Sequence, residues 1–458
     1  MRVKIPRILI AAGASGSGKT LITCGILQAL CSRGKRVSSF KCGPDYIDPM
    51  FHAKVIGTKA RNLDTFFTDE KTTQYLLQQN AKDTDISVIE GVMGYYDGLG
   101  GIDTKASAYD VARVTKTPVI FIINGKGMSL SAAAYLKGFM EYRKDSRICG
   151  VILNQISPMM YPQLKKRIEE ELCISVLGYV PKVDNLFLES RHLGLVMPQE
   201  IKSLNEKIKE FARQLENTLD LDRLIEMAEN AEDLEEVEIE IHRMKEKPVI
   251  AVARDEAFCF FYEDNLELLK KMGAELIEFS PIHDKKLPSG ADGLLLYGGY
   301  PELTARQLSQ NVQMRKSIKE AIVSGMPCMA ECGGFMYLHE TMEDMDGQEW
   351  PMTGVIKGRA YRTEKLGRFG YIEVEAKKEQ MLGMEAGKIC AHEFHYFDST
   401  SCGDYFYAEK PLRKRGWDCI HGEYRMIAGF PHLYYYSNRK IPEQFLRACV
   451  GFGKGNRV

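Results

Sequence analysis

The sequence predicts an α/β protein whose two domains are each built around a parallel sheet. Short β-rich runs alternate with helical stretches through residues 1–200, a pattern typical of parallel strands joined by crossover helices. A second strand–helix series starts after the highly charged segment 230–247. A chain of 458 residues is also longer than one ordinary core supports. We therefore expect domains over residues 1–230 and 248–458, joined by a charged linker over 231–247.

The elements of the first domain follow from runs of apolar and β-branched residues. Strands are expected at 8–11, 37–40, 86–89, 119–123 and 151–153, with a helix at 21–32 and a helix-rich stretch over 202–229. In the second domain we expect strands at 248–253, 276–279, 294–297, 326–330 and 424–428 and a helix at 265–272. The segment between the domains is acidic first and then basic, which indicates a solvated linker or surface element.

Composition narrows the class of protein. The chain is 45% hydrophobic and 27% charged with a formal net charge of −1, so no global field attracts nucleic acid or an anionic membrane. No signal peptide is visible, and the longest apolar runs have the length of strands. The twelve cysteines form no Cys-x-x-Cys pair, which favours reduced thiols in a cytoplasmic protein over a zinc ribbon.

Residues 13–20 read GASGSGKT and lie between an expected strand and an expected helix, the context of a phosphate-binding loop. In such a loop the glycines let backbone N–H groups surround phosphates at a helix N-terminus. The alternative is a Gly/Ser-rich turn that binds no nucleotide. The predicted nucleotide-binding residues of the loop are Gly13, Gly16, Gly18, Lys19 and Thr20. Lys19 is expected at the β- and γ-phosphates, and the Thr20 hydroxyl at Mg²⁺.

Two acids at strand ends are candidate partners of Thr20 at the metal. Asp45 follows the strand at 37–40 and Glu90 follows the strand at 86–89, where ligands bind in open α/β sheets. Either acid alone is equally well explained as a cap for its loop. Three further residues, Tyr46, Asp48 and Asp97, are weaker candidates for substrate binding. Asn154 is expected either to recognise the adenine base of the nucleotide or to cap a turn.

A second reactive site is predicted around Cys332. Small residues on both sides permit a strained strand-to-helix turn that presents the thiol, and a helix N-terminus lowers a thiol pKa. The glycine turn at 298–299 offers backbone N–H groups for an oxyanion, so Gly299 and Gly333 are the predicted oxyanion donors. Cys328 is expected in the core of the preceding strand.

A cysteine nucleophile requires a base, and histidine is the usual one. The C-terminal candidates are His392, His395, His421 and His432. His432 is favoured because it directly follows a glycine turn after an expected strand, although any one of the four is also explained as a structural histidine.

Several motifs of this sequence resemble those of the cobyrinic acid a,c-diamide synthases. They are FKCGPDYIDP at 40–49, EGVMG at 90–94, GMS at 127–129, SRHLG at 190–194, GGYPE at 298–302 and AECGG at 330–334. The resemblance runs in order over nearly the whole chain. It implies a dethiobiotin-synthetase-type P-loop domain followed by a class I glutamine amidotransferase domain, and an activity that consumes ATP and glutamine to amidate a corrinoid. It also implies that Thr20, Asp45 and Glu90 hold magnesium and that Asp48 and Asp97 lie near the macrocycle carboxylates.

The resemblance has one visible departure and leaves several alternatives open. Members of the family carry a second histidine two residues after the catalytic one, and here Tyr434 replaces it. Hydrogenobyrinic acid and nickel-sirohydrochlorin are alternative substrates to cobyrinic acid. The residues of the 41–45 loop, KCGPD, disfavour a cobyric acid synthase. The length of the chain disfavours a plain dethiobiotin synthetase, which would leave the C-terminal half unexplained. A regulatory P-loop ATPase with a degenerate amidotransferase module is the rival from another class. Roles for Arg191 and His192 and the oligomeric state, a homodimer included, stay open.

Overall fold

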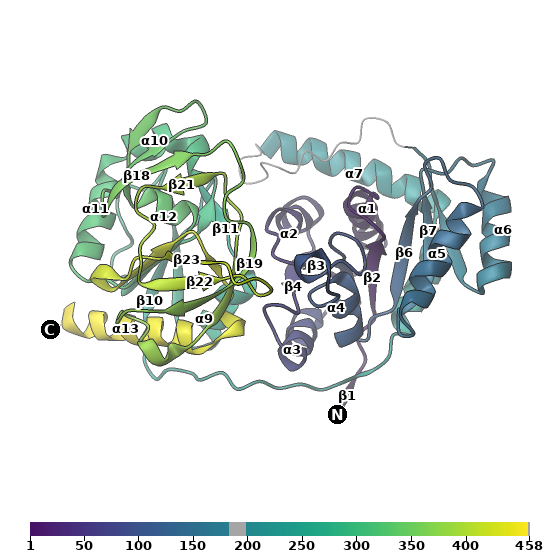
Figure 1. Ribbon diagram of the computed structural model, residues 1–458, viewed down its shortest axis with the longest axis horizontal. Coiled ribbons are helices and arrows are strands. Elements are labelled where there is room, and N and C mark those ends of the chain that lie inside the picture. Colours follow the sequence, from purple (N-terminus) through teal and green to yellow (C-terminus); the bar gives the residue numbers. More distant parts are fainter. Residues whose placement is uncertain (183–197, 457–458) are drawn as a thin grey trace. The chain divides into compact units, whose positions relative to one another are not determined.

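The protein consists of two compact units, Met1–Ile239 and Glu240–Val458 (Figure 1). The computed structural model describes residues 1–182 and 198–456. Within these ranges every helix is too short or too polar to traverse a lipid bilayer.

The first unit is built on a seven-stranded sheet in the order β4-β3-β5-β2-β6-β7-β8, and all of its strand pairs are parallel. Its central strands are buried along their whole length, which explains their continuous runs of Ile, Val, Leu and Phe. The strands are β2 Arg7–Ala12, β3 Val37–Cys42, β4 Lys59–Leu63, β5 Ile86–Glu90, β6 Val119–Asn124, β7 Ile148–Asn154 and β8 Ser175–Val180.

Helices join these strands, as the crossover rule for parallel sheets requires. They are α1 Lys19–Ser32, α2 Ile47–Phe51, α3 Glu70–Ala81, α4 Ala108–Val114, α5 Ser131–Tyr142 and α6 Tyr161–Leu172. Two further helices, α7 Pro198–Thr218 and α8 Leu221–Glu229, follow the last strand, β8. Local sequence sets their starts: Asp69 accepts a hydrogen bond from Thr72 N at the start of α3, and Ser107 does the same for Asp110 N at the start of α4.

The strand register of this sheet determines where its polar residues meet. Glu90, the last residue of β5, lies opposite Ile10 of β2 on one side and Lys41 of β3 on the other. Because the phosphate-loop segment leaves β2 at the same edge, the carboxyl ends of three neighbouring strands bring Lys41, Glu90 and residues 13–20 into one region.

Part of the charged segment after α8 packs on the first unit. β9, Leu234–Glu235, pairs antiparallel with β1, Arg2–Val3. The buried Arg7 guanidinium donates to the carbonyls of Thr115 and Glu232, at 3.0 and 2.6 Å. The segment is therefore anchored by backbone pairing as well as solvated by its charges.

The second unit has a five-stranded parallel sheet in the order β12-β10-β13-β15-β24. The strands are β10 Val249–Ala253, β12 Glu275–Phe279, β13 Gly293–Leu296, β15 Cys328–Glu331 and β24 Met426–Gly429, each of which overlaps an expected strand. The helices are α9 Glu263–Lys271, α10 Ala305–Gln310, α11 Val312–Val323, α12 Gly333–Tyr337 and α13 Lys440–Asn456.

Further strands, which the sequence pattern did not predict, fill the stretch between β15 and β24 and part of its surroundings; they pair antiparallel except β16 with β18, which is parallel. One sheet has the order β17-β16-β18-β21, a second has the order β23-β22-β19-β20-β25, and β11 pairs with β14. Their bounds are β11 Phe258–Phe260, β14 Gly298–Gly299, β16 His339–Glu343, β17 Glu349–Pro351, β18 Ile356–Arg362, β19 Gly370–Ala376, β20 Ile389–Glu393, β21 Phe397–Ser399, β22 Phe406–Glu409, β23 Gly416–Cys419 and β25 His432–Leu433. β25 places His432 opposite His392 of β20.

Candidate active sites

The phosphate loop connects β2 to α1 and is held closed by its own side chains. Gly16 and Gly18 have φ of 74° and 90°, a backbone conformation that favours glycine. The Lys19 ammonium donates to the carbonyls of Ala14 and Met93 at 2.9 and 2.6 Å. A side chain at Gly13 is excluded because its Cβ would lie 1.8 Å from the Tyr135 hydroxyl oxygen. The three glycines and Lys19 thus form the cradle that the motif predicts.

Burial weakens the hold of Lys19 on its proton. Burial, and then the neighbouring Lys41 charge, lower the Lys19 pKa to about 8, while Glu90 and Asp97 oppose the shift. A ligand that brings negative charge to this ammonium would therefore stabilise its protonated form.

Asn154 lies at the end of β7 and contacts the loop directly. Its side-chain amide donates to the Ser17 carbonyl at 2.9 Å, and a Cβ on Gly18 would lie 2.4 Å from the same Nδ2 atom. In this geometry Asn154 supports the backbone of the phosphate loop.

The structure brings two of the three expected magnesium ligands together. The Thr20 hydroxyl donates to Glu90 Oε1 at 2.6 Å. A hydroxyl at the start of α1 and a carboxylate at the end of β5 fit Mg²⁺, which takes few protein oxygens and completes its shell with phosphate oxygens and water.

The third expected ligand, Asp45, caps a turn. Its Oδ1 accepts hydrogen bonds from the backbone N–H groups of Ile47 and Asp48 at 2.8 and 3.1 Å. The Asn62 amide donates to the Gly43 and Asp45 carbonyls at 3.0 and 2.7 Å, which ties this loop to the end of β4. Of the two roles that the sequence left open for Asp45, the geometry shows the capping one.

Lys41 is the centre of a buried ion-pair cluster that the sequence motif did not explain. Its ammonium lies 2.6 Å from both Asp48 Oδ2 and Glu90 Oε1, and the His52 Nε2 atom lies 3.3 Å from Glu90 Oε2. Burial raises the Asp48 pKa to about 7. Burial acts the same way on Glu90, but Lys41 and His52 outweigh it and hold the Glu90 pKa below its usual range. Negative charge is thus concentrated on Glu90.

The two remaining substrate candidates occupy loops at the same edge. Tyr46 is buried and directly precedes α2. Asp97 closes the loop after β5, since its Oδ2 accepts a hydrogen bond from Gly94 N at 3.0 Å. Asp97 also contributes to the electrostatics of Lys19, so it lies close to the phosphate loop.

Cys332 occupies a strained turn between β15 and α12. Its φ is 47° and its ψ is −104°, outside the regions that a non-glycine residue normally adopts. Its backbone N–H donates to the Gly429 carbonyl of β24 at 2.8 Å, which holds the turn against the sheet. This is the strand-to-helix elbow that the small residues around Cys332 predict.

The expected lowering of the Cys332 thiol pKa is wrong. Burial raises that pKa far above the ordinary value, and nearby carboxyl groups, Glu302 first, act in the same direction. The helix that follows, α12, has only five residues, so its dipole is too short to compensate for desolvation. Burial thus favours the neutral thiol over the thiolate.

His432 and Cys332 flank the same glycine. A Cβ built on Gly298 would lie 2.6 Å from His432 Cε1 and 3.5 Å from Cys332 Cβ. Burial, with a contribution from His395, lowers the His432 pKa to about 3. A neutral imidazole beside a neutral thiol is the arrangement of a general base that accepts the proton as the thiol attacks.

The other histidines have different surroundings. The His392 ring stacks on His432 with centroids 4.9 Å apart, and its Nδ1 lies 3.1 Å from the Tyr262 hydroxyl. His395 Nε2 lies 3.1 Å from Glu393 Oε2, while His421 Nδ1 lies 3.3 Å from the exposed Glu423.

Glu331, immediately before the nucleophile, faces the base. Its Oε2 lies 3.8 Å from His432 Nδ1, and its Oε1 accepts a hydrogen bond from Leu433 N at 3.3 Å. Burial raises the Glu331 pKa to about 8. This acid, on the residue next to Cys332, therefore lies within ion-pair distance of the imidazole.

The two expected oxyanion donors lie next to each other. A Cβ on Gly333 would lie 3.2 Å from the Gly299 nitrogen, and a Cβ on Gly299 would lie 2.1 Å from the Ala257 carbonyl oxygen. Close packing therefore requires glycine at both positions. Cys328 is fully buried in β15, as expected.

The residues that sequence reasoning missed are Lys41, His52 and Glu331. A lysine within the otherwise uncharged strand VSSFKC was a usable signal for Lys41, whereas nothing in the local pattern marks His52. Arg191 and His192, for which no role was assigned, lie outside the described residues.

Comparison with known proteins agrees with both halves of the chain. Residues 8–196 match the CobQ/CobB/MinD/ParA nucleotide binding domain family, and residues 249–437 match the CobB/CobQ-like glutamine amidotransferase domain family. The combined fold class that the sequence predicted is therefore confirmed.

Full-length relatives carry a common name. The cobyrinate a,c-diamide synthase of Caldanaerobacter subterraneus subsp. tengcongensis is 39% identical over 98% of this chain and 99% of its own length. The proteins of the same name from Listeria innocua and Thermoplasma volcanium are 40% and 37% identical, over 98% and 100% of this chain and 100% of their own lengths. The chain belongs to the cobyrinate a,c-diamide synthase family of glutamine-dependent amidoligases.

Proposed function

We propose that the protein uses ATP and glutamine to convert the a- and c-acetate carboxylates of cobyrinic acid into amides by way of acyl phosphates. The observation that carries this proposal is the pairing, in one chain, of a phosphate loop whose Thr20 contacts Glu90 with a cysteine elbow whose base flanks Gly298. The full-length relatives named for this reaction support the choice of substrate.

The first site activates the substrate carboxylate. A carboxylate oxygen attacks the γ-phosphorus of ATP, the bond to the bridging oxygen breaks, and ADP leaves. Lys19 neutralises charge on the phosphates, and the loop N–H groups orient them. Thr20 and Glu90 are the residues that would hold Mg²⁺, which supplies further charge neutralisation when bound.

The polar cluster beyond the loop orients the second reactant. Lys41 keeps Glu90 ionised and bridges it to Asp48, and the buried Tyr46 lies two residues before Asp48 in the chain. Asp97 closes the opposite loop at Gly94. These residues position the macrocycle carboxylate for in-line attack, since phosphoryl transfer depends chiefly on positioning and charge.

The second site releases ammonia from glutamine. The Cys332 sulfur attacks the side-chain amide carbon while His432 accepts the thiol proton. The N–H groups of Gly299 and Gly333 stabilise the oxyanion, and His432 returns the proton to the departing ammonia. Water then hydrolyses the thioester to glutamate. The ammonia attacks the acyl phosphate carbon, phosphate leaves, and an amide remains.

Mass spectrometry of cobyrinic acid incubated with the protein, MgATP and glutamine tests the proposal. Each amidation replaces OH by NH2, so the product mass is expected to fall in two steps and then stop. If hydrogenobyrinic acid or nickel-sirohydrochlorin were amidated and cobyrinic acid were not, that macrocycle would replace cobyrinic acid as the assigned substrate. Absence of glutamine hydrolysis with every macrocycle would overturn the proposal in favour of a regulatory ATPase.

A further inference from the structure

The strand that carries His432 is short and lies at the edge of its sheet. β25 consists of His432 and Leu433 and is the last strand in the order β23-β22-β19-β20-β25. It pairs antiparallel with β20, and the N–H of the next residue, Tyr434, donates to the Cys390 carbonyl at 3.1 Å. Main-chain groups of a strand point alternately to its two edges, so the Leu433 N–H and C=O and the Tyr435 N–H face away from β20. Both residues are buried, and these groups therefore need partners that β20 does not supply.

The side chain of Asn265, on α9, supplies two of these partners. Its Nδ2 donates to the Leu433 carbonyl at 2.8 Å, and its Oδ1 accepts from the Tyr435 N–H at 2.9 Å. A residue of a neighbouring parallel strand would form the same two bonds, one to a carbonyl and one to the N–H two residues further on. The third group, the Leu433 N–H, donates to Glu331 Oε1 at 3.3 Å. The Asn265 amide thus takes the place of a strand on the outer edge of β25.

Asn265 is itself fixed in the fold. It is only 1% exposed, and its own N–H donates to the Tyr262 carbonyl at 3.0 Å in the first turn of α9. An asparagine amide carries a donor and an acceptor on one carbon, whereas a leucine side chain of similar size has neither. In the same turn the Tyr262 hydroxyl lies 3.1 Å from His392 Nδ1, and the His392 ring stacks on His432. The start of α9 therefore contacts both the main chain beside His432 and the ring packed on its imidazole.

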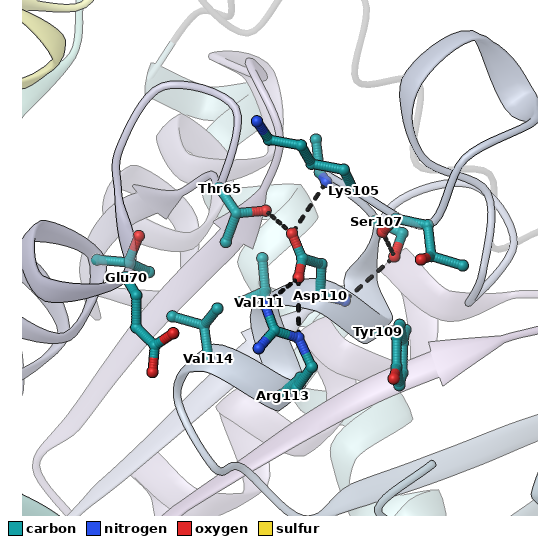
Figure 2. A network of polar contacts seen from close by, with 12 residues as sticks. Thr65, Glu70, Lys105, Ser107, Tyr109, Asp110, Val111, Arg113 and Val114 are labelled. Carbon is teal, nitrogen blue, oxygen red and sulfur yellow. Dashed lines mark hydrogen bonds and ion pairs between the residues drawn. The ribbon is translucent and has the colours of Figure 1, made fainter. Parts of the chain in front are cut away.

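A buried polar side chain also joins segments in the first unit. Asp110 accepts hydrogen bonds there from the Thr65 hydroxyl at 2.7 Å and from Ala106 N at 3.2 Å (Figure 2). The chemistry above assigns no role to these partners, so the fold alone explains that junction. Asn265 differs because it bonds to the main chain directly after the proposed base.

A small displacement of His432 is expected to matter because the cysteine site is tightly packed. A Cβ built on Gly298 would lie 2.6 Å from His432 Cε1 and 3.5 Å from Cys332 Cβ. A general base acts only within hydrogen-bond reach of the proton that it accepts, and a displacement of about 1 Å can cost about 10²-fold in rate. The two-residue strand that carries the base must therefore be held on both edges.

We infer that Asn265 is a positioning residue of the cysteine site, which fixes the main chain that carries His432 and so holds the imidazole within reach of the thiol. The inference rests on the proposed function, because it takes Cys332 and His432 as the reacting pair. Asn265 acts through the main chain and not on the glutamine. Its loss is therefore expected to lower the kcat of glutamine hydrolysis and to leave the KM for glutamine nearly constant.

Steady-state kinetics of the full chain, at saturating MgATP and cobyrinic acid, provide the test. Asn265→Leu keeps the size of the side chain and removes both hydrogen bonds, so the kcat of glutamine hydrolysis should fall about 10- to 100-fold while the KM for glutamine stays within about 2-fold. Asn265→Ser, which leaves room for a bridging water, is the milder variant if Asn265→Leu does not fold, and should lower kcat about 3- to 10-fold. Amidation driven by ammonium salts should stay within about 2-fold in both variants, because the phosphate-loop site is unchanged.

The matched control is Asn311→Leu, in the same unit. The Asn311 amide donates to the Asp284 carbonyl at 2.7 Å and accepts from Met314 N at 3.3 Å, at the start of α11. This variant loses a similar set of hydrogen bonds and should retain the wild-type kcat. Thermal melting of both variants compares what each substitution costs the fold.

Alkylation by iodoacetamide, read by peptide mass spectrometry, separates displacement of the base from loosening of the unit. A displaced base should slow the alkylation of Cys332 about 3- to 10-fold, because less help is available to remove the thiol proton. Loosening would instead accelerate it and would also expose Cys328, which is fully buried in the same strand.

The outcomes separate this inference from the proposed function. The role of Asn265 would be overturned by an unchanged kcat in both Asn265 variants, by a loss that lies entirely in the KM for glutamine, by an equal fall of kcat in Asn311→Leu, or by faster alkylation of Cys332. In each of these cases the wild type would still amidate cobyrinic acid and the proposed function would stand. If the wild type hydrolysed no glutamine, the proposed function and this inference would both fall.

Discussion

The two candidate sites differ in how they treat charge. Around the phosphate loop, Lys41 lies 2.6 Å from both Asp48 and Glu90, and Lys19 lies nearby, so full charges are buried and paired. Around Cys332, burial raises the thiol pKa and lowers that of His432 to about 3, so the reactive groups are neutral. Both sites are formed at the carboxyl ends of parallel strands.

The difference follows from what each ligand brings. A nucleotide carries several negative charges, and a site that binds it needs fixed cations and acids that stay ionised. The side chain of glutamine is uncharged, and the charge of its reaction arises only when the thiol attacks. A pre-formed thiolate buried near several carboxyl groups would be costly, and the structure avoids it by keeping the proton until the base accepts it.

The largest effect is expected for a variant that inactivates the cysteine site and leaves the phosphate-loop site intact. Cys332→Ser should lower glutamine-driven amidation by at least about 10³-fold, because the buried hydroxyl is a far weaker nucleophile. Activity with a high concentration of ammonium salts should persist, since the phosphate-loop residues are unchanged. Amide product is measured with each nitrogen donor in turn.

The matched control for that variant is Cys328→Ala, which removes a buried thiol from the same strand without touching the elbow. It should retain glutamine use. Loss of ammonium-driven activity in Cys332→Ser would show that the two sites do not divide the reaction as proposed.

The next effect tests whether the stability of the phosphate-loop site depends on the ion pairs of Lys41. Lys41→Met leaves Asp48 and Glu90 buried without their cation and should lower the free energy of unfolding by about 3–5 kcal/mol. The control Lys116→Met removes a cation from the exposed pair with Glu232 and should cost less than about 1 kcal/mol. Urea denaturation at neutral pH measures both. Equal losses in the two variants would mean that the Lys41 cluster contributes no more than a surface ion pair.

The smallest effect is expected for Glu331, in the cysteine site, where the reactive groups are neutral. Glu331 has a raised pKa of about 8, so the folded protein favours its neutral form and loses stability as the pH rises from the ordinary glutamate value toward 8. Above that pH the carboxylate is ionised and supports the imidazolium that forms during attack. The kcat of glutamine hydrolysis should then rise about 2- to 5-fold between about pH 7 and pH 9, and Glu331→Gln should abolish the rise.

The KM for glutamine is expected to stay constant in this variant, because Glu331 acts on His432 and not on the substrate. Glu423→Gln is the control, since it removes an exposed acid beside a histidine outside the site, His421. A pH profile of Glu331→Gln that matched the wild type would exclude Glu331 as the positioning residue.

Sequence reasoning predicted five of the seven strands of the first parallel sheet and all five of the second, mostly from apolar runs whose signal is local. It missed the two edge strands of the first sheet, β4 and β8. It also missed the strands between β15 and β24, where burial alternates, as in Ile356–Arg362, and the runs are short. It recognised Lys19, Thr20 and Cys332 from motifs whose spacing reflects one turn of backbone. It assigned no role to Lys41 or Glu331, although both lie inside the motifs that it used.

The sequence by itself determined the order of the strands along the chain, the phosphate loop, the cysteine elbow and the family, because each depends on residues close together in the chain. Only the tertiary structure decided which groups meet: Glu90 with Thr20 and Lys41, and Glu331 with His432 across 101 positions of sequence. It also decided the sign of the Cys332 pKa shift, because desolvation depends on every element that packs around the thiol and outweighs the local helix.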